Sequence, residues 1–181
     1  MAEIKSTMDL IMEKTRHLSM TEDEKKEKRQ QDARQELQGL ICKIEDKTIK
    51  TTEFEKSYET IKSTYHDGQA VDVDAMLRDE LINRLDLDAD NTARLQLLGR
   101  YFNIDTQQFF ELFSAYNTAL DHARQTRLAR RKQQLAQDRQ ISGTAVIPNL
   151  AADSDWAQEI DQLKSEYGKR LDALKQKSAE A

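Results

Sequence analysis

The sequence predicts an all-α fold, a small helical bundle core with long helical extensions. Apolar side chains recur every three to four residues along most of the chain, the spacing that places them on one face of a helix. One Pro and five Gly interrupt 181 residues, and both residue types disfavour helix interiors. Valine occurs only three times, and no segment shows the alternation of β-branched and aromatic residues that strands prefer.

The composition indicates a chain with much water-exposed surface. Charged residues make up 34% and hydrophobic residues 38%, with a mean hydropathy of −0.83. The formal net charge of −5 gives no general attraction to nucleic acid or anionic membranes. The start of the chain lacks the plan of a secretory signal, and no apolar run approaches the roughly 20 residues that span a bilayer. We therefore expect a cytoplasmic protein without a membrane segment. Its single cysteine, Cys42, excludes an intramolecular disulfide, and we expect it to be buried and inert.

Residues 1–50 are expected to form an N-terminal helical arm. A first helix over 6–16 has a Met-rich face, which either folds back on the body or docks a partner. Thr21 and Glu24 have the spacing of a capping box and start a second helix. Residues 22–32 contain no apolar side chain, so this stretch is either solvated helix or disordered. An apolar stripe follows it: Ala33, Leu37, Leu40, Ile41 and Ile44.

Residues 51–120 are expected to form the helical core. Its first helix starts at Thr51-Thr52 with a capping box to Glu55, and Gly68 suits a left-handed cap after its end. The seam of this helix recurs at helical spacing, at Phe54, Tyr58, Ile61 and Tyr65.

Two shorter helices and the start of the longest one complete this core. Asp72 or Asp74 caps the first short helix, and Asp90 or Asn91 caps the second. A tight turn at Asn103–Asp105 then leads into the longest helix. The apolar positions of the three helices are Met76, Leu77, Leu81, Ile82, Leu85, Leu95, Leu97, Leu98, Tyr101, Phe102, Phe109, Phe110, Leu112, Phe113, Tyr116 and Leu120.

The longest helix is expected to continue beyond its apolar face as a basic segment over 121–141. Arg124, Arg127 and Arg131 share one helix face. This face is either solvated or binds an acidic partner, a second copy or nucleic acid. The segment has no interleaved aromatic side chains for base stacking, which favours a protein among these partners.

Residues 142–153 are expected to form an extended strap, with Val146 and Ile147 packed on a helix, and 154–181 a C-terminal amphipathic helix. Acids lie near the start of this helix and bases near its end, which suits the helix dipole. The helix either packs back on the longest helix as a helical hairpin or pairs with a second subunit like a coiled coil. Its stripe consists of Trp156, Ile160, Leu163, Tyr167, Leu171 and Leu174.

No pattern of catalytic or metal-ligating residues is evident. Asp86, Asp88 and Asp90 have the spacing of the first three ligands of a calcium loop, but Asn91 and Leu97 stand where that loop needs Gly and Glu. None of the three histidines has a spacing that suits zinc. We expect no metal, no cofactor and no small-molecule ligand.

A helix-turn-helix is a possible interpretation of the turn at Asn103–Asp105. Asn tolerates the left-handed backbone that this turn requires, and Gln107 and Gln108 would then face a DNA groove. No Lys or Arg accompanies them to grip phosphate. A helical hairpin without a DNA role explains the same residues.

The sequence thus favours a non-enzymatic protein–protein interaction or assembly module, with a protein partner or self-association. A helix-turn-helix nucleic-acid-binding protein and an all-α enzyme with a site assembled from distant residues are the alternatives. The residues expected to bind the partner are Trp156, Ile160, Leu163, Tyr167, Leu174, Arg124, Arg127 and Arg131.

Overall fold

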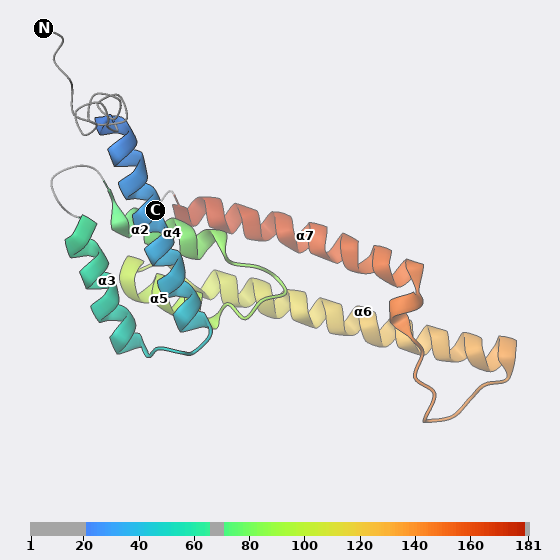
Figure 1. Ribbon diagram of the computed structural model, residues 1–181. Helices are drawn as coiled ribbons and strands as arrows, with labels where there is room; N and C mark the ends of the chain where they lie inside the picture. The colour runs from blue at the N-terminus through green and yellow to red at the C-terminus, as the bar shows by residue number, and fades with distance from the viewer. Residues whose placement is uncertain (1–20, 66–70, 180–181) are drawn as a thin grey trace, which may run out of the picture. The chain divides into compact units, whose positions relative to one another are not determined.

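A computed structural model describes residues 21–65 and 71–179, and within these ranges the chain forms helices and no strand, which confirms the all-α fold (Figure 1). The expected first helix over 6–16 and the cap at Gly68 lie outside the described residues. The elements are α2 (Glu22–Glu45), α3 (Thr51–Tyr65), α4 (Val73–Asn83), α5 (Thr92–Phe102), α6 (Gln107–Arg139), the short 3-10 helix η2 (Leu150–Ala152) and α7 (Ser154–Ala179).

The chain divides into two compact units, residues 1–77 and residues 78–181. The boundary lies within α4 and inside the range 51–120 that the sequence predicts as one core. Each unit is described by itself.

In the first unit, α2 begins with the predicted capping box. Glu24 N donates to Thr21 Oγ1 at 3.2 Å, and Thr21 N donates to Glu24 Oε2 at 2.7 Å. Residues 22–32 are therefore helical, the first of the two alternatives, although nearly all their side chains are exposed. An ion pair between Lys25 and Glu22 at 2.7 Å stabilises this first turn.

The stripe of α2 packs against α3, which follows it after a short connection. Tyr65 Oη also donates to Glu36 Oε1 of α2 at 3.0 Å. Both helices thus bury the faces that their apolar spacing predicted. The buried residues are Ala33, Leu37, Leu40 and Ile41 on α2 and Phe54, Tyr58 and Ile61 on α3.

Two expectations for this unit are wrong. Cys42 is exposed, because it lies about 140° around the helix from the buried Leu37, outside the apolar stripe. The carboxylate that closes the first turn of α3 is Glu53, whose Oε2 accepts from Lys50 N at 2.9 Å, and not Glu55. The helix is thus capped from Lys50, one residue earlier than the sequence suggested.

Asp74 joins α3 to the start of α4. Tyr58 Oη donates to Asp74 Oδ1, and Lys62 Nζ lies 2.9 Å from Asp74 Oδ2. Desolvation of this carboxylate opposes its charge, but the hydrogen bonds from Tyr58 and Lys62 hold its pKa below the ordinary value. The capping role falls to Asp72, whose Oδ1 accepts from Ala75 N at 2.9 Å.

In the second unit, α7 lies along α6 in the opposite direction, so the two form a long hairpin (Figure 1). Of the two arrangements open to the C-terminal helix, the structure has the one that packs back on the same chain. On α6 the buried residues are Phe109, Leu112, Tyr116 and Ala123, and on α7 they are Trp156 and Leu171.

The connection between α6 and α7 differs from the expected strap. Gln140 ends α6 in a left-handed conformation with φ 56°, two residues before the predicted stop at Ser142. Ile147 is 83% exposed, so the expectation that it packs on a helix is wrong. Val146 is half-buried. The extended segment is short and ends in η2, which immediately precedes α7.

The acidic run after α4 is closed by a buried asparagine. Asn91 Nδ2 donates to the carbonyls of Asp86 and Ala89 at 2.6 and 3.2 Å, and its Oδ1 accepts from Asp86 N at 3.2 Å. Asp90 Oδ1 accepts from Thr92 N at 3.0 Å at the start of α5. This run is therefore a loop between two helices, and the cap of α5 at Asp90 is one of the two that the sequence predicted.

Candidate interaction surface

The apolar stripe of α7 is used mainly within the chain. Trp156 and Leu171 are buried, and the rest of the stripe is half-buried: Ile160, Leu163, Tyr167 and Leu174. The ring of Tyr167 packs edge-on against Tyr116 of α6, with centroids 5.5 Å apart. The stripe therefore packs on α6 of the same chain, and little of it is left exposed for a partner.

Two of the three predicted basic residues hold a carboxylate at the start of α7. Arg127 donates through Nε and Nη2 to the two oxygens of Asp153 at 2.7 and 2.6 Å, and Arg131 Nε donates to Asp153 Oδ2 at 2.7 Å. Arg127 Nη2 also reaches Asp155 Oδ2 at 2.7 Å. Only 2% of the Asp153 side chain is exposed. We call Arg127, Arg131 and Asp153 the arginine clamp.

The clamp fixes the charge of all its members. The hydrogen bonds from Arg127 and Arg131 hold the pKa of Asp153 far below its usual range, and those to Asp153 raise the pKa of both arginines. Asp153 also starts α7, since its Oδ1 accepts from Asp155 N at 3.2 Å. Arg127 and Arg131 thus stabilise the hairpin corner, while Arg124 is exposed.

A second polar cluster ties the loop after α4 to both long helices. Tyr116 Oη donates to Asp88 Oδ1 at 2.8 Å, and Lys164 Nζ of α7 lies 2.7 Å from Asp88 Oδ2. Lys164 and Tyr116 lower the pKa of Asp88, and burial together with Asp88 raises the pKa of Tyr116 to about 12. Asp88, one of the three aspartates with calcium-loop spacing, therefore accepts a hydrogen bond from the buried Tyr116 and forms an ion pair with Lys164.

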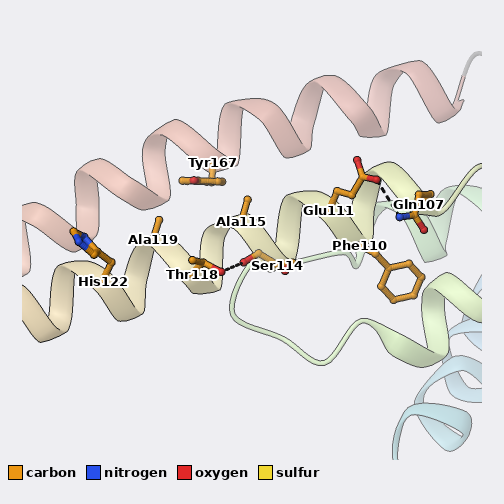
Figure 2. Close-up of a pocket in the computed structure, with 9 residues that line it drawn as sticks. All are labelled: Gln107, Phe110, Glu111, Ser114, Ala115, Thr118, Ala119, His122 and Tyr167. Carbon is orange, nitrogen blue, oxygen red and sulfur yellow. Dashed lines mark hydrogen bonds between the residues drawn. The ribbon is translucent and has the colours of Figure 1, made fainter.

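The outer face of α6 carries an open hollow of about 810 Å³, with Tyr167 of α7 at one side (Figure 2). Phe110 in its lining is 44% exposed, which is unusual for a phenylalanine in this chain. The remaining α6 side chains are small or polar. We call this surface the α6 hollow; its lining consists of Gln107, Phe110, Glu111, Ser114, Ala115, Thr118, Ala119, His122 and Tyr167.

The polar groups of the α6 hollow are paired locally or lie far apart. Gln107 Nε2 donates to Glu111 Oε1 at 3.0 Å, and Thr118 Oγ1 donates to the carbonyl of Ser114 at 2.8 Å. Glu111 and His122 lie toward opposite ends of the hollow in Figure 2, and eleven helical positions correspond to about 16 Å along the axis. They cannot act on one reacting atom, whereas an extended partner could contact both.

The start of α6 does not offer free amides to a DNA groove. The Gln107 amide donates to Glu111, and Gln108 Nε2 donates to Asp105 Oδ2 at 3.0 Å. Asn103 does have the left-handed backbone expected of the turn, with φ 51°. Arg127 lies twenty positions from Gln107, or about 30 Å along the helix. The carboxylates beside both glutamines would repel phosphate.

Sequence reasoning missed the α6 hollow because it searched for apolar stripes. The signal that could have revealed it is the repeat of small residues at Ser114 and Ala115 and again at Thr118 and Ala119. Small side chains at a spacing of four lie on one helix face and leave room for another element.

Groups of metal ligands and membrane-spanning helices are not found in the described ranges. Residues 21–65 and 71–179 contain no group of three or more His, Cys, Asp or Glu side chains placed to hold a metal. None of the helices in these ranges combines the length and the apolar character that crossing a membrane requires. Comparison of the chain with protein-family models, curated proteins and solved structures gives no match.

Proposed function

We propose that this chain is a non-enzymatic helical interaction module that binds a protein through the α6 hollow. The observation that carries the proposal is the exposed Phe110 at one end of a hollow that is also lined by the small side chains of Ala115 and Ala119. A phenylalanine 44% exposed next to a hollow loses contact with water when a partner covers it. Alanines let the backbone of that partner approach closely.

The construction of the hairpin supports this use. The arginine clamp holds one end of the α6–α7 pair, and the Tyr116–Asp88–Lys164 cluster holds its middle. Both clusters limit how far α7, and with it Tyr167, can move relative to α6. A surface already fixed in its bound shape gives up less conformational freedom on binding.

The same clusters speak against a catalytic role for their members. The clearest pKa shifts in the second unit belong to Tyr116, Asp153 and Arg127. Each of these groups is engaged in a specific hydrogen-bonded pair that joins α6 to a connecting segment, and none of them lines the α6 hollow. Structural ion-pair networks also shift pKa values, so these shifts fit a structural role.

Site-specific photo-crosslinking in the cell of origin tests the proposal. A photoreactive residue replaces Ser114, which is exposed in the hollow, and in a matched control it replaces Ser165, which is exposed on α7. We expect a covalent adduct with a polypeptide from position 114 and little from position 165. Equal yields from both positions, or no adduct from either, would contradict the proposal.

A further inference from the structure

We infer that the occupant of the α6 hollow is a second copy of this chain. The two α6 helices would be antiparallel, and the twofold axis would cross the hollow at the level of the peptide between Tyr116 and Asn117. This inference rests on the proposed function and names its partner. The observation behind it is that six of the eight α6 residues in the lining form pairs at equal distances from that point, and one of these pairs joins the acidic Glu111 to the basic His122.

A twofold interface pairs residues that lie at equal distances on either side of the axis. Glu111 and His122 are equally far from the midpoint between Tyr116 and Asn117. The same relation joins Ser114 to Ala119 and Ala115 to Thr118, and all six residues line the hollow. A copy turned by half a rotation therefore places small residues against small residues, so the two helices can approach closely.

The charges favour this antiparallel arrangement over a parallel one. Glu111 and His122 are the acidic and basic members of the lining. In the antiparallel pair each Glu111 carboxylate faces the imidazole of the other copy's His122, which can donate a hydrogen bond, and this contact forms twice. A parallel pair in register would bring two Glu111 carboxylates together and would be disfavoured.

The hollow also has the right boundary for a second hairpin. Phe110 and Tyr167 flank the small residues of α6, and Figure 2 shows Tyr167 reaching toward α6 from α7. Pairing two hairpins through α6 would make a four-helix arrangement. Helices packed in such bundles approach to about 8–10 Å, and the close end of that range requires small contact residues.

Light scattering and sedimentation of the full chain over a range of concentrations test this inference. We expect a dimer whose Kd rises about tenfold or more in Glu111→Lys and in His122→Glu, because each change replaces two attractive contacts. An equimolar mixture of the two variants should recover the dimer, since the introduced lysine and glutamate face each other and the native Glu111 and His122 form the second contact.

Steric controls separate this surface from others. Ala115→Trp should abolish the dimer, because its position is at the centre of the hollow, whereas Ala173→Trp on an exposed position of α7 should not. Unchanged helical circular dichroism in each variant shows that the fold is intact. A variant pair that fails to recover the dimer on mixing would overturn the antiparallel arrangement.

The experiments distinguish failure of the second-copy inference from failure of the proposed function. If the chain is a monomer at every concentration while position 114 crosslinks a different polypeptide, the proposed function holds and the second copy is excluded. A crosslink from position 114 to residues 1–20 of the same chain would overturn both. Crosslinks between positions 114 and 119 of two differently tagged copies would support the inference directly.

Discussion

The hydroxyl of Tyr116 is expected to contribute measurably to the stability of the second unit. Tyr116 is 1% exposed, and its hydroxyl donates to Asp88 at 2.8 Å. A hydrogen bond to a charged group contributes about 1.5–3 kcal/mol. Because the Asp88 side chain is 50% exposed and also pairs with Lys164, we expect the lower end, about 1.5 kcal/mol, for Tyr116→Phe. The phenyl ring retains the edge-on contact with Tyr167, so no cavity adds to this value.

Urea unfolding followed by fluorescence measures the loss. Trp156 is the only tryptophan and lies in the same unit as Tyr116, so its signal reports the relevant unfolding. The slope with denaturant should stay constant while the midpoint falls. A double-mutant cycle with Asp88→Asn isolates the pair and should give a coupling of about 1 kcal/mol. Additive single losses, or a loss below about 0.5 kcal/mol for Tyr116→Phe, would refute the reasoning.

The Tyr116–Asp88 pair predicts how the stability of the second unit changes at alkaline pH. The pKa of Tyr116 in the folded protein, about 12, lies above the ordinary value of 10.0, because burial and Asp88 disfavour the tyrosinate. A raised pKa gives stability that is complete below pH 10 and lost as the pH rises from 10 to 12. Wild type should therefore lose stability in this window, and Tyr116→Phe should lose less. Identical pH profiles for the two proteins would contradict this assignment.

Three further outcomes are expected. Asp153→Asn should destabilise the hairpin corner more than Asp155→Asn, because 2% of the Asp153 side chain is exposed and 69% of the Asp155 side chain is exposed. Faster amide hydrogen exchange at the start of α7 in Asp153→Asn would show this loss of stability. Equal exchange rates in the two variants would contradict the role of Asp153 in the arginine clamp. Leu171→Ala should lower the free energy of unfolding by about 3 kcal/mol, since Leu171 is 4% exposed. Unfolding followed by Trp156 fluorescence measures this loss. A loss under about 1 kcal/mol would argue against the burial of Leu171. Cys42 is exposed, so a thiol reagent should label it in the folded protein as fast as in urea, and labelling only after unfolding would contradict its position.

The helices were predictable because their signals are local. The seam of α3 at Phe54, Tyr58 and Ile61 and the capping box at Thr21 and Glu24 each involve residues a few positions apart. Such patterns determine which side of a helix is apolar, whatever the rest of the chain does. Local signals were less reliable for single residues at the edge of an apolar stripe, as for Cys42 of α2, which is exposed.

The polar contacts between helices were not predictable in the same way. Arg127 and Arg131 lie 26 and 22 positions from Asp153, and the sequence around them shows only like charges on one face. Tyr116 lies 28 positions from Asp88. Identifying either pair requires the register between α6 and its neighbours, which apolar spacing leaves undetermined. The α6 hollow was missed for the related reason that small residues carry a weak hydropathy signal.

The position of Asp153 has a consequence for a chain that has been cut. The exposed segment around Ile147 lies between the two arginines and the aspartate that binds them. A protease that cleaves a peptide bond there separates α6 from α7 covalently but leaves every contact of the arginine clamp on the two fragments. The fragments should therefore stay together as a nicked protein until a denaturant separates them.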